Sequence, residues 1–178
     1  MSKQAGRMSQ GANDFLTPYA PTIGTATDVG TARAYNNGAV TVTFTADATN
    51  AATSFTASGY CSVHSTTHSV SGASSPLTIT GFGTGAVTNI TVTATNSYGT
   101  SVASAASNSV TVTTVPGAAG SVAVASTVNA QDQLTWTEPL TGGKAITSRR
   151  WTSSDGKSGS GVSPRTIAQE PATAQTYT

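Results

Sequence analysis

Apolar and polar residues alternate along the most regular stretches of the chain. Residues 40–44 run Val-Thr-Val-Thr-Phe, and residues 90–94 run Ile-Thr-Val-Thr-Ala. A period of two places all the apolar side chains on one face, which predicts half-buried β-strands. Clusters of Gly, Asn, Pro and Ser separate these stretches and indicate turns. Many short strands bounded by turns predict an all-β antiparallel sandwich. The same alternation appears in four more segments, residues 77–79, 110–112, 122–124 and 134–136.

The chain also contains an approximate internal repeat. The stretch TPYAPTIGTAT from Thr17 recurs loosely as TVPGAAGSVAV from Thr114, with an offset of about 95 residues. AVTVTFTAD from Ala39 recurs in the same way as DQLTWTEPL from Asp132. The repeat predicts an N-terminal arm over residues 1–16, a complete domain over residues 17–114 and a second domain over residues 115–178.

Composition and charge exclude several classes of function. Only 8% of the residues are charged, and 8 Lys and Arg against 7 Asp and Glu leave a net charge of +1, so no basic surface for nucleic acid is expected. No window approaches the roughly 18 to 20 consecutive apolar residues of a membrane span. The start MSKQAGRMSQGANDFL lacks the apolar core of a signal peptide, which predicts synthesis in the cytoplasm. The single cysteine, Cys61, excludes an intramolecular disulfide.

Two longer stretches resemble the fibronectin type III family. LTWTEPLTGGKAITSRRW is similar to strand B, the proline-containing loop and strand C of that family, with Trp136 at the usual core position. TNITVTATNSYGTSVASAASNSVTVTTVPGA is similar to strands F and G followed by the start of a new repeat. The first domain has Phe44 in place of the core tryptophan, and Thr88 where strand F usually begins with a tyrosine. The resemblance spans residues 17–178 and implies a fibronectin type III-like sandwich.

The same resemblance implies that the second domain is incomplete. Aligning the two repeats places Tyr177 opposite Thr88, so strands F and G have no counterpart within the 178 residues. Strand C, expected over residues 145–152, would then have an open edge. Three alternatives follow: a neighbouring subunit supplies the strand, the chain continues beyond this sequence, or the second domain is a shortened and rearranged β-domain.

A more specific wording resembles virion structural proteins of tailed bacteriophages of the marine or cyanophage type. It consists of NDFLTPYAPTIGTAT, VGTARAYNNGAVTVTFT and the Ala- and Ser-rich ASAASNSVTV. This resemblance implies a non-enzymatic structural component of the capsid, neck or tail. Its expected partners are other virion proteins and copies of itself. We expect the arm to anchor it through Met8, Phe15 and Leu16.

The sequence offers few groups for catalysis or for metal and cofactor binding, and we expect none of these activities. His64 and His68 lack a nearby acidic third ligand for a metal ion. Cys61 is expected to be a small buried apolar residue. Catalysis by Cys61 with His64 is disfavoured, because residues three apart on a strand point to opposite faces.

Residues 149–151, Arg-Arg-Trp, form the densest cationic and aromatic cluster. Trp151 is expected to face the core with Trp136, and Arg150 to face outward. Arg149 then either points inward and needs a partner such as Asp155, Glu170 or an acidic group of another subunit, or reaches to water from the edge. The alternative function is carbohydrate binding or host adhesion, for which exposed aromatic rings are needed. The candidate rings are Tyr19, Tyr35, Tyr60 and Tyr98.

Overall fold

A computed structural model describes residues 16–127, 131–154 and 156–168, and the chain divides into two compact units between Thr114 and Val115. The description below takes each unit by itself. Unit 1 comprises the described residues up to Thr114, and unit 2 those from Val115 onward. Within the described residues no helix has the length and apolar character that a membrane crossing requires. The fold is all-β, as the alternating pattern predicts.

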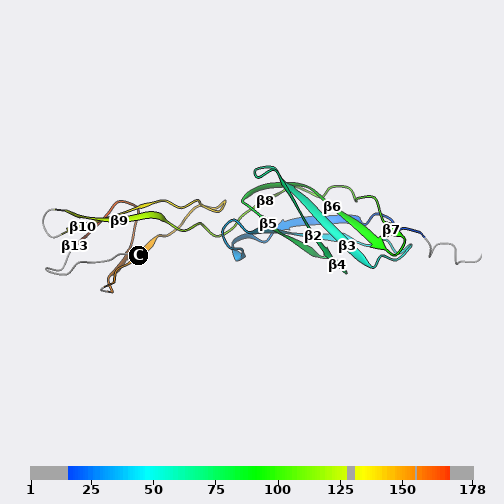
Figure 1. Ribbon diagram of the computed structural model, residues 1–178, viewed down its shortest axis with the longest axis horizontal. Coiled ribbons are helices and arrows are strands. Elements are labelled where there is room, and N and C mark those ends of the chain that lie inside the picture. Colours follow the sequence, from blue (N-terminus) through cyan, green and yellow to red (C-terminus); the bar gives the residue numbers. More distant parts are fainter. Residues whose placement is uncertain (1–15, 128–130, 155, 169–178) are drawn as a thin grey trace, which may run out of the picture. The chain divides into compact units, whose positions relative to one another are not determined.

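Unit 1 is a sandwich of two antiparallel sheets (Figure 1). The first sheet has the order β1-β2-β5, with strands Thr22–Asp28, Gly38–Thr45 and Leu77–Phe82. The second has the order β4-β3-β6-β7, with strands Thr66–Gly72, Ser54–Cys61, Gly85–Asn96 and Gly99–Thr100, and β8 (Val110–Val112) also pairs with β6. A single 3-10 turn, Gly30–Ala32, follows β1. This is the strand order of a fibronectin type III sandwich, so the expected fold class is confirmed.

The core of unit 1 forms from the alternate residues of facing strands. In β2 the residues Val40, Val42 and Phe44 are buried, and the threonines between them are half-buried or exposed. In β6 the same holds for Ile90, Val92 and Ala94. Because threonine and valine are both branched at Cβ, they suit the pleated backbone on either face. The remaining buried side chains of this cluster are Ala26, Phe55, Ala57, Cys61, Leu77, Ile79, Phe82, Val87, Val110 and Val112.

Residues 101–109 close the edge of the second sheet without forming a regular strand. Ser101, Ser104 and Ser107 donate their backbone N–H groups to the carbonyls of Ala94, Val92 and Ile90 at 2.8, 2.9 and 2.9 Å. The Oγ atoms of Ser101 and Ser104 also accept hydrogen bonds from the N–H groups of Ala94 and Val92, both at 3.0 Å. At these two residues a serine hydroxyl thus takes the place of a strand carbonyl. We call Ser101, Ser104 and Ser107 the serine ladder.

The serine ladder differs from a strand in its rise along the sheet. Each step covers two residues of β6, about 6.6 Å at a strand rise of about 3.3 Å per residue, but uses three residues of the edge segment. Each repeat therefore contains one bulged residue, and bulges bend and blunt a sheet edge. An edge of this kind is a poor template for pairing with another strand.

Two polar side chains connect segments distant in sequence within unit 1. The carboxamide of Asn108 donates to the carbonyl of Ala26 at 2.9 Å and accepts from its N–H at 3.0 Å, at the point where the register of β1 shifts. The carboxylate of Asp28 accepts the backbone N–H of Thr113 at 3.2 Å and its hydroxyl at 2.5 Å. These contacts attach β1 of the first sheet to the chain around β8, which belongs to the second.

Unit 2 repeats the first five strands of this arrangement among its described residues. One sheet has the order β13-β10-β9, formed by Arg165–Ala168, Gln131–Thr137 and Gly120–Thr127. The other consists of β11 (Arg150–Thr152) and β12 (Ser158–Ser160). Strand C was expected over residues 145–152, but β11 begins only at Arg150, so that expectation is corrected. Tyr177, the expected start of strand F, lies outside the described residues.

A matching hydrogen bond supports the equivalence of the two units. In unit 1 the N–H of Phe44 donates to the Oγ of Ser75 at 2.9 Å. In unit 2 the N–H of Trp136 donates to the Oγ of Ser163 at 3.1 Å. In each case the serine precedes a proline. Phe44 therefore occupies in unit 1 the position that Trp136 occupies in unit 2, as the sequence alignment predicts.

Candidate functional site

Unit 2 has an apolar groove of about 230 Å³ between its two sheets. Val122 of β9, Leu134 and Trp136 of β10 and Trp151 of β11 line it, together with loop residues. Leu134 and Ile167 are the buried apolar residues of this unit, and the two tryptophans pack against them while staying partly exposed. The core of unit 2 is therefore accessible from outside. The loop residues in the lining are Pro116, Gly117, Ala119, Pro139, Ile146, Ser148 and Arg149, and Arg150 of β11 completes it.

Two valines of β9 are more exposed than the alternating pattern predicts. Val122 is 47% exposed and Val124 is 39% exposed, whereas one face of this strand was expected to be buried. The sheet that faces them contains only β11 and β12 among the described residues, and both are three residues long. Within residues 131–154 and 156–168, little apolar surface lies opposite β9 to cover these side chains.

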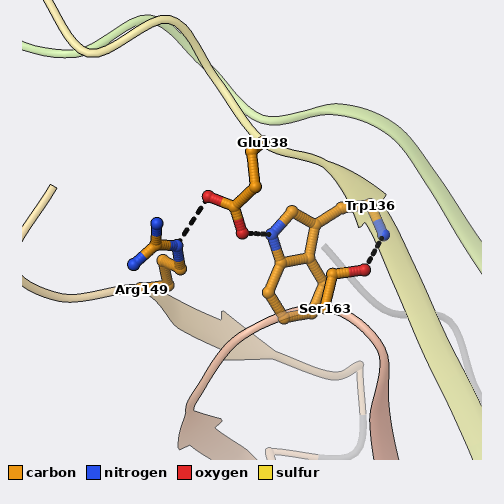
Figure 2. A network of polar contacts seen from close by, with 4 residues as sticks. All are labelled: Trp136, Glu138, Arg149 and Ser163. Carbon is orange, nitrogen blue, oxygen red and sulfur yellow. Dashed lines mark hydrogen bonds and ion pairs between the residues drawn. The ribbon is translucent and has the colours of Figure 1, made fainter.

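Two residues of the groove lining, Trp136 and Arg149, belong to a polar network with Glu138 (Figure 2). The indole N–H of Trp136 donates to Oε1 of Glu138 at 3.1 Å, and Nε of Arg149 donates to Oε2 of the same carboxylate at 2.6 Å. The side chains of Arg149 and Glu138 are 29% and 42% exposed to solvent, so the ion pair is partly solvated. The network fixes the orientation of the Trp136 ring.

This network gives Arg149 a partner that the sequence analysis did not name. The sequence analysis left open Asp155, Glu170 or an acidic group of another subunit for an inward Arg149, or water for an arginine at the edge, and Asp155 and Glu170 lie outside the described residues. The observed partner is Glu138, which follows the end of β10 at Thr137. The signal was present in the sequence, because Glu138 stands two residues after Trp136, and residues two apart on an extended chain share a face.

Trp151 and Arg150 are neighbours on β11 and both line the groove, but they differ in exposure. Trp151 packs with Trp136 against the core of unit 2, and Arg150 is exposed. The Trp151 ring lies over Gly159, its partner in β12, where a Cβ atom would be only 2.7 Å from the ring. A glycine is therefore required opposite this tryptophan.

The chain enters unit 1 between two asparagine side chains. Nδ2 of Asn96 donates to the carbonyl of Leu16 at 2.9 Å, and Nδ2 of Asn50 donates to that of Thr17 at 3.2 Å. Leu16 itself is 51% exposed. Met8 and Phe15, the other expected anchors of the arm, lie outside the described residues.

Two of the four candidate tyrosines lie at this end of unit 1. Tyr19 and Tyr98 are 58% and 48% exposed and line two adjacent hollows that share Asn50. The residues that line these hollows carry no charge. Tyr35 is 38% exposed and lies outside them, and Tyr60 is half-buried in β3.

The geometry expected for Cys61 and His64 is wrong. Sγ of Cys61 and Nδ1 of His64 are 3.3 Å apart. The alternation rule does not apply, because β3 ends at Cys61 and His64 belongs to the turn that follows. The His64 ring lies against Gly83, where a Cβ atom would be 2.1 Å from it. Cys61 is fully buried, as expected.

His68 is separate from this pair. Its ring contacts Phe82 edge-on, with the ring centres 5.0 Å apart. In the part of the chain that the structure describes, no three His, Cys, Asp or Glu side chains gather as metal ligands.

Comparisons with known proteins describe the fold alone. No protein-family model and no curated protein sequence matches the chain. Among solved structures, the titin kinase with its flanking domains is similar at 13% identity and a TM-score of 0.41, over 68% of this chain and 27% of that one. The FN1–FN3 domains of chicken CNTN1 are similar at 10% identity and a TM-score of 0.41, over 90% of this chain. The chain spans about half (54%) of the length of that structure.

Proposed function

We propose that the protein is a non-enzymatic structural component of a tailed-phage virion and acts through protein–protein contacts. The observation that carries the proposal is the apolar groove of unit 2, which the described residues leave open, whereas the core of unit 1 is closed. A groove lined by two tryptophans and several aliphatic side chains suits contact with another protein, since aromatic residues are enriched at the centres of interfaces.

The sequence supports the virion part of the proposal. The segments around residues 13–27 and 29–45 resemble phage structural proteins, and charged residues make up only 8% of the chain. Contacts between uncharged surfaces depend little on ionic strength, because there are few charges to screen. On this proposal the protein resides in the virion, with other virion proteins and copies of itself as neighbours.

The test is to find the protein in purified particles. Mass spectrometry of particles and labelling by specific antibodies in electron micrographs should detect it at a fixed position and copy number. Its intact mass should also be measured, since a value above 17.7 kDa would reveal further chain beyond this sequence. Particles that lack the protein at every stage of assembly would refute the proposal.

The arm provides a second, independent test. Deleting residues 1–16 should prevent incorporation while unit 1 stays folded, because the core cluster described for unit 1 forms from residues 26–112. Normal incorporation of the deletion variant would refute the anchoring role of Met8, Phe15 and Leu16.

Binding of a neutral host-surface saccharide is the second candidate function. Tyr19 and Tyr98 favour it, since exposed aromatic rings beside uncharged polar groups suit the apolar faces and hydroxyls of a sugar. A glycan array should then show binding that Tyr19→Ala abolishes and Tyr35→Ala preserves. An array without signal above background would eliminate this candidate.

A further inference from the structure

The loop between the 3-10 turn and β2 ends on the single Asn–Gly dipeptide of the sequence, Asn37–Gly38. Asn37 is exposed, and Gly38 is the buried first residue of β2. Asparagine is a thermolabile residue, since its side-chain amide can be lost to attack by the backbone nitrogen of the next residue. A glycine in that next position hinders the attack least, because it has no Cβ atom. The dipeptide is therefore a reactive position at the surface of unit 1.

Packing inside unit 1 requires the glycine of this dipeptide. A Cβ atom at position 38 would overlap Cγ1 of Val112 in β8 and lie 3.3 Å from Cγ2 of Thr114. Val112 and Thr114 are both fully buried, so neither can move aside without disturbing the close-packed interior. The fold thus keeps at position 38 the residue that leaves the Asn37 carboxamide most open to attack.

Hydrogen bonds hold the loop that presents Asn37. The N–H of Arg33 donates to the carbonyl of Gly30 at 3.1 Å, and the N–H of Asn37 donates to the carbonyl of Ala34 at 3.0 Å, which closes a β-turn over residues 34–37. The Arg33 side chain folds back onto this turn, and its Nε donates to the carbonyl oxygen of Asn37 at 2.9 Å. A guanidinium therefore contacts the peptide group that joins Asn37 to Gly38.

This contact bears on the chemistry of the peptide group. Deamidation begins when the Gly38 N–H loses its proton, and resonance spreads the negative charge over the nitrogen and the Asn37 carbonyl oxygen. A cationic donor already placed on an atom where negative charge develops lowers the barrier. Arg33 is such a donor, and it forms no ion pair with the residues that the structure describes.

We propose that Asn37–Gly38 is a self-modification site at which Arg33 promotes deamidation. The Gly38 nitrogen gives its proton to water and bonds to Cγ of Asn37, and the bond from Cγ to Nδ2 breaks as ammonia leaves with a proton taken from water. A second water molecule opens the cyclic imide at either carbonyl, which leaves aspartate or isoaspartate at position 37. The reaction consumes only water, and it lowers the net charge of the chain from +1 to zero.

The test follows deamidation of the folded full-length protein. Fresh protein is incubated in mildly alkaline buffer, and peptide mass spectrometry with an isoaspartyl methyltransferase assay locates and quantifies the product. Modification should accumulate at Asn37 and add a more acidic band on isoelectric focusing. Asn36 and Asn108 are internal controls that should stay intact. Asn36 is followed by another asparagine, and the Asn108 carboxamide is bound to the backbone of Ala26.

Two variants separate the effect of the Arg33 contact from that of the dipeptide alone. Arg33→Gln should slow deamidation of Asn37 at least about threefold, because the developing charge loses its cationic donor. Arg165→Gln removes the same charge from an exposed residue of β13 and should leave the rate unchanged. Circular dichroism should confirm that both variants are folded. In urea that unfolds unit 1, the parent protein and Arg33→Gln should react equally fast, since the contact is then lost.

Three results would overturn the proposal. The first is a level of modification at Asn37 no higher than at Asn36 and Asn108. The second is an equal rate for the folded parent protein and the folded Arg33→Gln variant. The third is a difference between these two proteins that persists in urea. None of these results bears on the detection of the protein in particles, so failure of this inference is distinguishable from failure of the proposed function.

Discussion

Replacing Ser104 by alanine tests whether the serine ladder closes the sheet edge. Ser104 is only 8% exposed, and its Oγ accepts the N–H of Val92, a residue with no exposed surface. The same hydroxyl donates to the carbonyl of Ala105 at 2.7 Å. The backbone bond from Ser104 N–H to the Val92 carbonyl does not involve the side chain and should survive.

The loss of stability depends on whether the former partner of each lost hydrogen bond can bond to water instead. Without the hydroxyl, the Val92 N–H is buried without an acceptor, which costs about 1–3 kcal/mol. The Ala105 carbonyl belongs to an exposed residue and can bond to water, so its loss adds little. We expect Ser104→Ala to lower the free energy of unfolding of unit 1 by about 2 kcal/mol. At about 4–8 °C per kcal/mol for a domain of this size, the melting temperature should fall by about 8–16 °C.

The distribution of aromatic residues suggests the assay. Both tryptophans lie in unit 2, so tryptophan fluorescence follows the unfolding of unit 2, while calorimetry and circular dichroism follow both units. Ser104→Ala should lower the melting temperature of unit 1, which calorimetry and circular dichroism detect, and leave the unfolding of unit 2, which tryptophan fluorescence follows, unchanged. Ser109→Ala is the matched control, because Ser109 is exposed and its side chain forms no hydrogen bond to the described residues. Equal effects of the two substitutions, or a loss below about 0.5 kcal/mol for Ser104→Ala, would refute the role assigned to the hydroxyl.

Three further substitutions probe other contacts. Asp28→Ala should lower the stability of unit 1 by about 2 kcal/mol in urea unfolding, because Thr113 loses its charged acceptor, whereas the exposed Asp47→Ala should cost less than half as much. Gly83→Ala should displace the His64 ring and speed the reaction of the Cys61 thiol with a thiol reagent. Gly120→Ala is the control and should leave the rate unchanged, because a Cβ atom there would be 3.8 Å from Thr137. Equal rates for the two variants would contradict the packing of His64 against Gly83. Glu138→Gln should change stability by no more than about 0.5 kcal/mol, since a partly solvated ion pair contributes little, but Glu138→Ala should shift tryptophan emission because the Trp136 indole loses its acceptor. A shift of equal size in both Glu138 variants would argue against that hydrogen bond.

The alternating residues of β2, β5 and β6 were predictable because half-buried strands impose a period of two on the sequence. The edge segment was not recognised, because its period is three and its contacts use a side-chain hydroxyl where a strand uses a carbonyl. The spacing of Ser101, Ser104 and Ser107 was the available signal. In this region the hydrogen-bonding side chains determine the structure more than apolar burial does.

The candidate sites were less predictable than the strands. The packing of Trp151 against the core and the exposure of Arg150 followed from strand alternation. The contact of Cys61 with His64 depended on where β3 ends, and the pairing of Arg149 with Glu138 depended on how two loops approach each other. Positions of strand ends and loop approaches are set by tertiary packing, which a single sequence does not specify.

The three-residue period of the serine ladder has a consequence for how this module can vary. Only one residue in three carries the contact to β6, and Val102, Ala103, Ala105 and Ala106 between the serines are exposed. Substitutions at these positions change the outer surface without altering the hydrogen bonds that hold the segment. A single inserted residue, in contrast, would shift every following serine out of phase. We therefore expect related sequences to conserve the spacing of the serines and to diversify the residues between them, which makes this segment a natural place to graft new recognition sequences.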